Sequence, residues 1–217
     1  MKKTDTPIVV PAGLEARKPE FSEYLAAAKL RLEKFAGRYG WQYLTDKTFV
    51  DSWEIYDDKR DFDRRICELA GVATDTKLPA TYSGALERRV LVTVTPGLYL
   101  ANYPQGDEPE AFAKLLCHEM AHRLHIRILD GNEEAMGPVW FYEGFALFAA
   151  GQFADSYQSL AENELLGIFA ESERGDYRRY AHAFRQLAGR VESFQDFLTW
   201  PAKEDFMQRL KRLLENG

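Results

Sequence analysis

The segment His118-Glu119-Met120-Ala121-His122 lies in an apolar run, and it constrains the fold because its two histidines can act together only on a helix. On a helix, residues four positions apart share a face, so the imidazoles of His118 and His122 can reach one metal ion. Glu119 projects beside them. Two imidazoles and a carboxylate commonly hold a catalytic zinc ion and leave a fourth position open for water. The pentapeptide therefore predicts a zinc site on a helix.

A third protein ligand is expected for a catalytic zinc ion. The segment 137–148 begins with Gly137-Pro138 and continues as an apolar helix that contains one carboxylate, Glu143. An unpaired carboxylate in such company costs about 2 kcal/mol or more, so a cation beside it is expected. A reversal at Asp130-Gly131-Asn132 can return the chain to the histidine pair. Glu143 is thus the predicted third ligand, and the alternative is a helix-surface acid or an acid that stabilises the dipole near a helix N-terminus.

The two helices together carry His-Glu-x-x-His and then Trp-x-x-Glu-Gly-x-Ala, which resembles the gluzincin group of zinc metallopeptidases over residues 109–152. Within this group, the chain is distantly similar to the aminopeptidase-N catalytic domain. It implies a zincin-like fold, zinc ligands at His118, His122 and Glu143, and a general base at Glu119. The expected reaction is hydrolysis of a peptide bond by a zinc-activated water.

Other candidates near this motif are weaker. The metzincin pattern would place a third histidine six residues after the second, where this chain has Ile128. His125 follows His122 by only three residues, and three ligands on one helix would strain a tetrahedral site, so we interpret it as a packing residue. The run Gly84-Ala85-Leu86-Glu87-Arg88 faintly resembles the Gly-x-Met-Glu-Asn stretch that gluzincin aminopeptidases place before their HExxH motif, but a hairpin turn explains it better.

An oxyanion donor is also needed. Gluzincins commonly place a Tyr or His on a helix after the ligand glutamate, and Tyr180 in Tyr-Ala-His-Ala-Phe is similar to that element. Tyr180 is the first choice, and His182 remains open. The alternative for Tyr177, Tyr180 and Phe184 is a helical packing stripe.

Composition excludes several classes of protein. The chain has 217 residues, 46% of them hydrophobic, which suits one domain with a sizeable core. The net charge of −6 without a basic stripe argues against nucleic acid, and no apolar stretch reaches the length of a membrane span. The apolar part after Met1 is too short for a signal peptide, so a cytoplasmic location is expected. Cys67 and Cys117 are expected to be reduced core thiols.

We predict a single α+β domain over residues 1–217, with an extended lead-in (1–18), a helix and sheet part (19–106) and a helical part with the metal site (107–217). The expected fold has a small, mostly antiparallel sheet packed on the HExxH helix and a helical C-terminal half. Hydrophobic periodicity and turn residues predict helices at 19–37, 57–70, 107–129, 138–150, 157–172, 176–189 and 202–215, and strands at 47–56, 79–86 and 89–95.

The sequence therefore favours a zinc metallopeptidase whose peptide or protein substrate adds a strand to a sheet edge within residues 79–95. Two alternatives stay open: a non-catalytic zinc-binding scaffold, and a zinc hydrolase of another amide or ester. The sequence does not determine cleavage specificity or oligomeric state.

Overall fold

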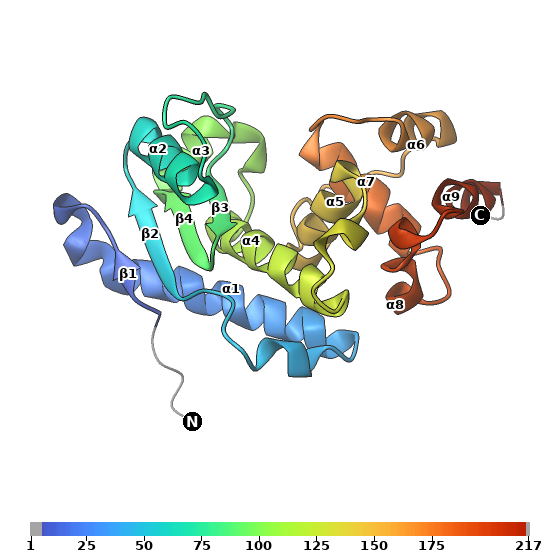
Figure 1. Ribbon diagram of the computed structural model, residues 1–217, viewed down its shortest axis with the longest axis horizontal. Helices are drawn as coiled ribbons and strands as arrows, with labels where there is room; N and C mark the ends of the chain where they lie inside the picture. Colours follow the sequence, from blue (N-terminus) through green and yellow to red (C-terminus); the bar gives the residue numbers. More distant parts are fainter. Residues whose placement is uncertain (1–5, 216–217) are drawn as a thin grey trace. The chain divides into compact units, whose positions relative to one another are not determined.

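The computed structural model describes residues 6–215 (Figure 1). The described residues form two compact units. Unit 1 contains the described residues up to Arg31 and Lys47–Met120; unit 2 contains Leu32–Asp46 and the described residues from Ala121 onward. The fold is α+β, as predicted.

Unit 1 holds the sheet. Its elements are β1 (Ile8–Val9), β2 (Ser52–Tyr56), α2 (Lys59–Ala70), β3 (Gly84–Glu87), β4 (Val90–Val94), α3 (Pro96–Asn102), most of α1 (Lys18–Arg38) and the first part of α4 (Ala111–Ile128). Unit 2 is helical. It contains the rest of α1 and α4 together with α5 (Val139–Ala150), α6 (Glu162–Phe169), α7 (Tyr177–Ala188), α8 (Phe194–Phe197) and α9 (Phe206–Glu215).

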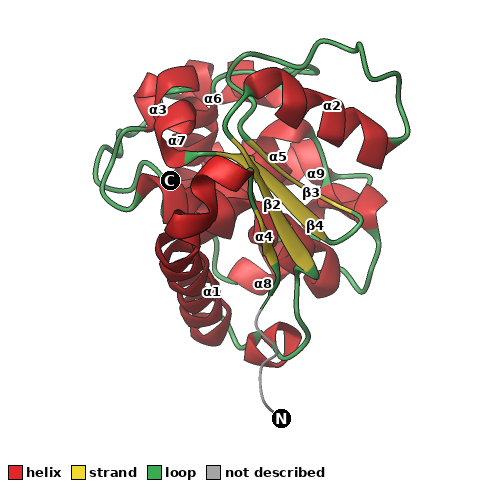
Figure 2. Cartoon of the chain, turned by 90° about the vertical axis from the view of Figure 1, so that its left-hand side faces the viewer, coloured by secondary structure: helices red, strands yellow, loops and turns green. Residues whose placement is uncertain are grey.

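The sheet has the strand order β1-β2-β4-β3. Figure 2 draws its strands in yellow and labels β2, β4 and β3. Strand β2 pairs in parallel with both β1 and β4, and only β3 and β4 are antiparallel. The prediction of a mostly antiparallel sheet is therefore wrong, and the sheet is mixed. The cause is the connection between β2 and β4, which includes α2 and so returns the chain in the same direction. The β3–β4 hairpin turns through Arg88 and Arg89, both at positive φ.

Trp53 of β2 lies at the centre of the unit 1 core. Its side chain is fully buried, and its indole Nε1 donates a hydrogen bond of 2.9 Å to the hydroxyl of Thr93 on β4. The ring of Phe21 on α1 meets it edge-on at 5.9 Å, and that of Phe112 on α4 lies 6.2 Å away. The first turns of α4 therefore pack on the sheet, as expected from the sequence.

The core of unit 2 is aromatic. Helices α5 and α7 pack closely, because Gly144 lies where a Cβ atom would come within 2.7 Å of Phe184 Cβ. Around this contact the rings approach mostly edge-on or tilted, which is the arrangement that aromatic pairs prefer. The participating rings are Phe35, Phe141, Phe145, Phe148, Phe184, Phe194 and Phe197.

Some elements differ from those predicted. The lead-in is not simply extended, because Ala12–Arg17 form a 3-10 helix after β1; its first five residues lie outside the described part of the chain. Helix α3 is not among the predicted helices; it follows the predicted strand 89–95 directly, and Pro96 occupies its first turn. The short α8 was also missed. Helix α6 is shorter than the predicted segment 157–172.

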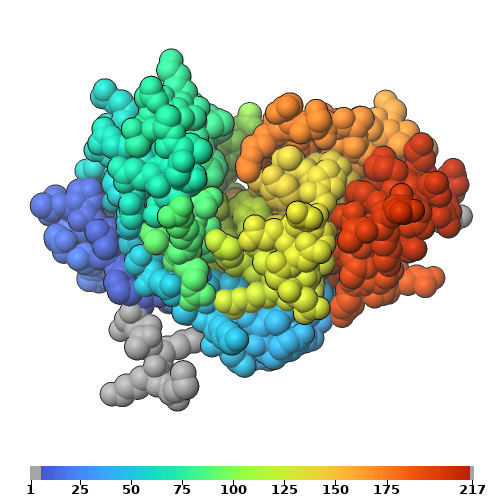
Figure 3. Space-filling view, in the orientation of Figure 1, coloured from blue at the N-terminus to red at the C-terminus, as the bar shows by residue number. Residues whose placement is uncertain are grey.

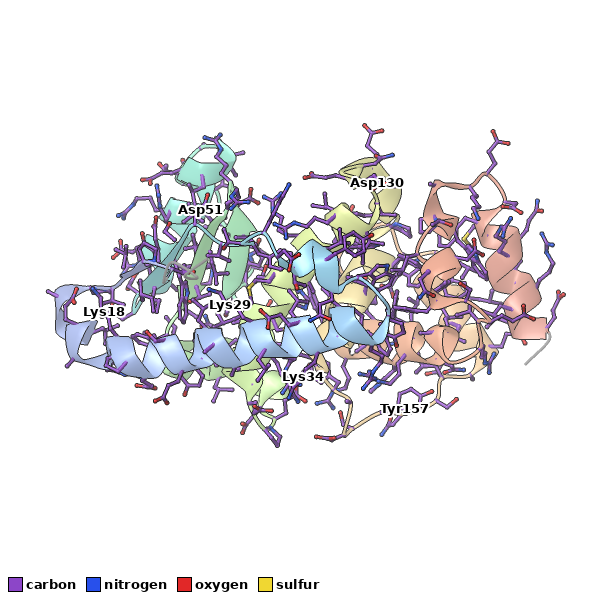
Figure 4. The ribbon with its side chains drawn as sticks, turned by 90° about the horizontal axis from the view of Figure 1, so that it is seen from below. Lys18, Lys29, Lys34, Asp51, Asp130 and Tyr157 are labelled. Atoms are coloured by element: carbon purple, nitrogen blue, oxygen red, sulfur yellow. The ribbon has the colours of Figure 1, made fainter. Side chains whose placement is uncertain are left out.

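Several loops are mostly exposed. The loop of residues 71–82, between α2 and β3, is exposed over most of its length and lies on the face shown in Figure 3. In unit 2 the loop between α5 and α6 carries Tyr157, which lies at the surface (Figure 4). Among the described residues, no helix is both long enough and apolar enough to cross a membrane.

Candidate metal centre

Helix α4 carries the histidine pair. It contains neither Gly nor Pro, and Met120 and Leu124, which share one of its faces, are both fully buried. The helix ends where predicted, since Asp130 and Gly131 have φ values of 54° and 89° and the N–H of Gly131 donates to the carbonyl of Ile126 at 2.8 Å.

Glu143 lies on α5, a helix that begins after Pro138 and ends at Gly151 in the left-handed region, close to its predicted bounds. The residue is 1% exposed. One ligand atom each from His118, His122 and Glu143 lies within 4.8 Å of the other two. The three side chains that the sequence predicts as ligands therefore lie close together.

The donor set fits a zinc ion. Glu143 Oε2 lies 3.6 Å from His122 Nε2. Zinc bonds of about 2.0 to 2.2 Å in a tetrahedron place neighbouring ligand atoms roughly 3.3 to 3.6 Å apart, so this pair already has the spacing of two ligands. The other pairs of ligand atoms in this group lie no more than 4.8 Å apart, so only a small shift of the side chains is needed to reach the same spacing. Two imidazoles and a carboxylate also leave one tetrahedral position for water.

Glu119, the predicted base, lies beside the sheet edge within unit 1. A Cβ atom on Gly84 of β3 would lie 3.1 Å from Glu119 Oε1 and 3.3 Å from Leu115 Cδ1. Gly84 therefore leaves the space that the Glu119 carboxylate occupies. Because β3 is the last strand of the sheet, this carboxylate lies against the face of an edge strand.

Tyr180, the predicted oxyanion donor, is fully buried in unit 2. Its hydroxyl donates to Glu171 Oε2 at 2.6 Å and accepts from the backbone N–H of Gly175 at 2.6 Å. Burial and the bond to Glu171 raise the pKa of this hydroxyl well above its usual value. In this structure the hydroxyl is thus engaged with the loop before α7.

His182, the second candidate donor, is 3% exposed, and its ring lies edge-on to Tyr157 at 5.8 Å. Burial, followed by the charges of Arg185 and Arg178, lowers the pKa of its imidazole. The ring is therefore favoured in its neutral form.

His125 is a packing residue, as expected. It is fully buried, its ring lies 4.3 Å from that of Phe145, and within the described chain neither ring nitrogen has a hydrogen-bond partner. Burial lowers the pKa of His125 to about 3. Cys67 and Cys117 are both buried free thiols, also as expected.

Two residues near Glu143 were missed by sequence reasoning. Arg174 donates from Nη1 to Glu143 Oε1 at 2.7 Å, and the ring of Tyr142 lies 5.8 Å from that of His122. Burial raises the pKa of the Tyr142 hydroxyl. Tyr142 could have been found as the neighbour of the proposed ligand. Arg174 lies in a loop without periodicity, and no sequence signal connects it to Glu143.

Comparisons of the chain with protein-family models, with curated proteins and with solved structures found no match. The geometry of the site and the sequence motif are therefore the basis for a functional proposal.

Proposed function

We propose that the chain is a zinc-dependent metallopeptidase of the gluzincin type, with His118, His122 and Glu143 as zinc ligands. The observation that carries the proposal is the convergence of these three side chains, two from α4 and one from α5. Imidazole and carboxylate donors in this number are the set used by catalytic rather than structural zinc sites, which are usually closed by four protein ligands.

A zinc ion supplies Lewis acidity, which lowers the pKa of water at an open ligand position to about 7. The role proposed for Glu119 is to accept a proton from the attacking water and to pass it to the leaving amine nitrogen. Its position next to His118 on the same helix supports this role.

The place of Glu119 beside β3 supports a peptide as the substrate. An extended peptide can add to the outer edge of a terminal strand through main-chain hydrogen bonds. Strand β3 is such a strand, and Gly84 at its start borders the Glu119 carboxylate. A peptide aligned on β3 would thus pass close to the proposed base.

The test is a pair of measurements on the purified chain: its metal content, and its turnover of a mixed peptide library read by mass spectrometry. Glu119→Gln should retain zinc and lose about 10²- to 10⁴-fold in rate. Glu134→Gln, a matched change at an exposed residue, should behave as the wild type. His118→Ala should lose zinc.

The outcomes separate the alternatives. A wild-type chain that does not bind zinc would remove the metal site from consideration. Stoichiometric zinc without turnover of any peptide would favour a non-catalytic zinc-binding module, and turnover of another amide or ester alone would favour a different zinc hydrolase.

A further inference from the structure

Arg174 lies in the loop between α6 and α7 and reaches the carboxylate of Glu143 within unit 2. Its Nη1 donates to Glu143 Oε1 at 2.7 Å and also to the hydroxyl of Tyr177. The Arg174 side chain is 47% exposed, whereas that of Glu143 is 2% exposed. One end of a buried acid is therefore held by a cation that approaches from the surface.

The two oxygens of Glu143 have different partners. Oε1 accepts from Arg174, and Oε2 lies 3.6 Å from His122 Nε2. The two oxygens of a carboxylate are equivalent, so a half-turn restores the same contacts, whereas a smaller rotation would break the bond to Arg174. The contact with Arg174 thus holds the plane of the carboxylate so that one oxygen is directed at His122.

The loop that carries Arg174 is itself anchored on α7. Tyr180 binds both sides of it, through the Glu171 carboxylate and the N–H of Gly175. A Cβ atom on Gly175 would lie 2.3 Å from Glu171 Oε2 and 2.7 Å from the Tyr180 oxygen, so a larger residue here would displace the ends of these two side chains. The backbone next to Arg174 is therefore held by one buried hydroxyl.

We propose that Arg174 is a positioning residue for the metal centre: it orients Glu143 so that Oε2 alone is presented as a ligand. The inference rests on the proposed function, since it assigns a role toward the zinc ion. Outer partners of metal ligands orient them, and their removal typically lowers metal affinity by about 10- to 100-fold.

The opposite role is that Arg174 is an internal cation that competes with zinc for Glu143. The two roles predict changes of opposite sign. A competitor would be expected on the oxygen that faces the other ligands, whereas Arg174 binds the oxygen that does not face His122. This placement favours orientation over competition.

The experiment measures the zinc dissociation constant by competition with a chromophoric chelator. Arg174→Met should bind zinc about 10- to 100-fold more weakly than the wild type, and Arg174→Lys should lie between the two. Arg190→Met is the matched control, because Arg190 is an exposed arginine of the same unit, and its affinity should be unchanged.

Circular dichroism of the metal-free variants establishes that they are folded. If Arg174→Met does not fold, Arg174→Lys decides the question, because lysine keeps the charge but loses the planar donor group. Unchanged or tighter zinc binding by the folded variant would overturn the proposal.

The control His118→Ala separates the two levels of inference. If the wild type does not bind zinc, or if His118→Ala binds it equally well, the proposed metal site itself is wrong. If His118→Ala loses zinc while Arg174→Met retains full affinity, only the role of Arg174 is wrong.

Discussion

Gly84 faces the carboxylate of Glu119 with almost no space between them: a Cβ atom at this position would lie 3.1 Å from Oε1 and 3.3 Å from Cγ of the glutamate. The carboxylate of the proposed catalytic base thus packs directly against the backbone of β3, because Gly84 has no side chain.

Gly84→Ala should lower the peptidase rate roughly tenfold, because the added methyl group pushes the Glu119 carboxylate from its position. The zinc content should remain that of the wild type, since neither histidine is displaced. Gly97→Ala is the control, as a Cβ atom at Gly97 meets nothing within 4 Å. A full rate in Gly84→Ala would show that Glu119 has room to adjust.

Gly144→Ala should destabilise the chain by about 1 to 3 kcal/mol, because the new Cβ would lie 2.7 Å from Phe184 Cβ, an atom close to the backbone of α7. Helix propensity alone would favour alanine by about 1 kcal/mol. Gly167→Ala on α6 measures the effect of helix propensity alone, since a Cβ atom there meets nothing within 4 Å. This variant should be as stable as the wild type or more stable. Urea denaturation of both variants measures the difference, and equal stability of the two would contradict the close packing of α5 on α7.

His125 should make the stability depend on pH. Its pKa is about 3 in the folded chain and about 6.5 when unfolded, so between these values the unfolded state binds more protons. Stability is therefore lost as the pH falls from about 6.5 toward 3, by about 2 kcal/mol at pH 5.

His125→Leu should remove this loss. The measurement is urea denaturation of the metal-free wild type and variant, with EDTA present, at pH 7 and at pH 5. The variant should lose less stability between the two values than the wild type by about 2 kcal/mol. Equal losses in both proteins would show that the His125 ring becomes protonated without unfolding.

Tyr180→Phe distinguishes the role predicted from the sequence from the one suggested by its contacts. If Tyr180 anchors the Arg174 loop, the variant should bind zinc more weakly, because the loop loses its bonds to the hydroxyl. If Tyr180 is an oxyanion donor, the variant should keep its zinc affinity and lose about 10²- to 10³-fold in kcat. Zinc titration together with steady-state kinetics on any peptide found to be cleaved separates the two.

The site was largely predictable because its signals are local. The spacing of His118 and His122 on one helix, and a lone carboxylate in the apolar segment around Glu143, are visible in the sequence. Both helices end at glycines in the left-handed region. The structure places these three side chains close to one another, and their role as metal ligands stays a prediction.

The remaining features depend on pairings that a single sequence does not encode locally. A strand of two residues such as β1 has no pattern that fixes its partner or direction, so the parallel pairings were missed. The contact of Arg174 with Glu143 joins residues 31 positions apart through a loop. The packing that requires Gly144 involves Phe184, on another helix.

The two buried thiols have a practical consequence. Cys67 and Cys117 both belong to unit 1, and burial raises the pKa of Cys117 to about 12, so its thiol is protonated and shielded at neutral pH. A reagent that reacts with cysteine thiolates can modify these residues only after unit 1 opens. The rate at which the two cysteines are labelled would thus measure how often the unit that carries Glu119 opens, without a cysteine having to be introduced.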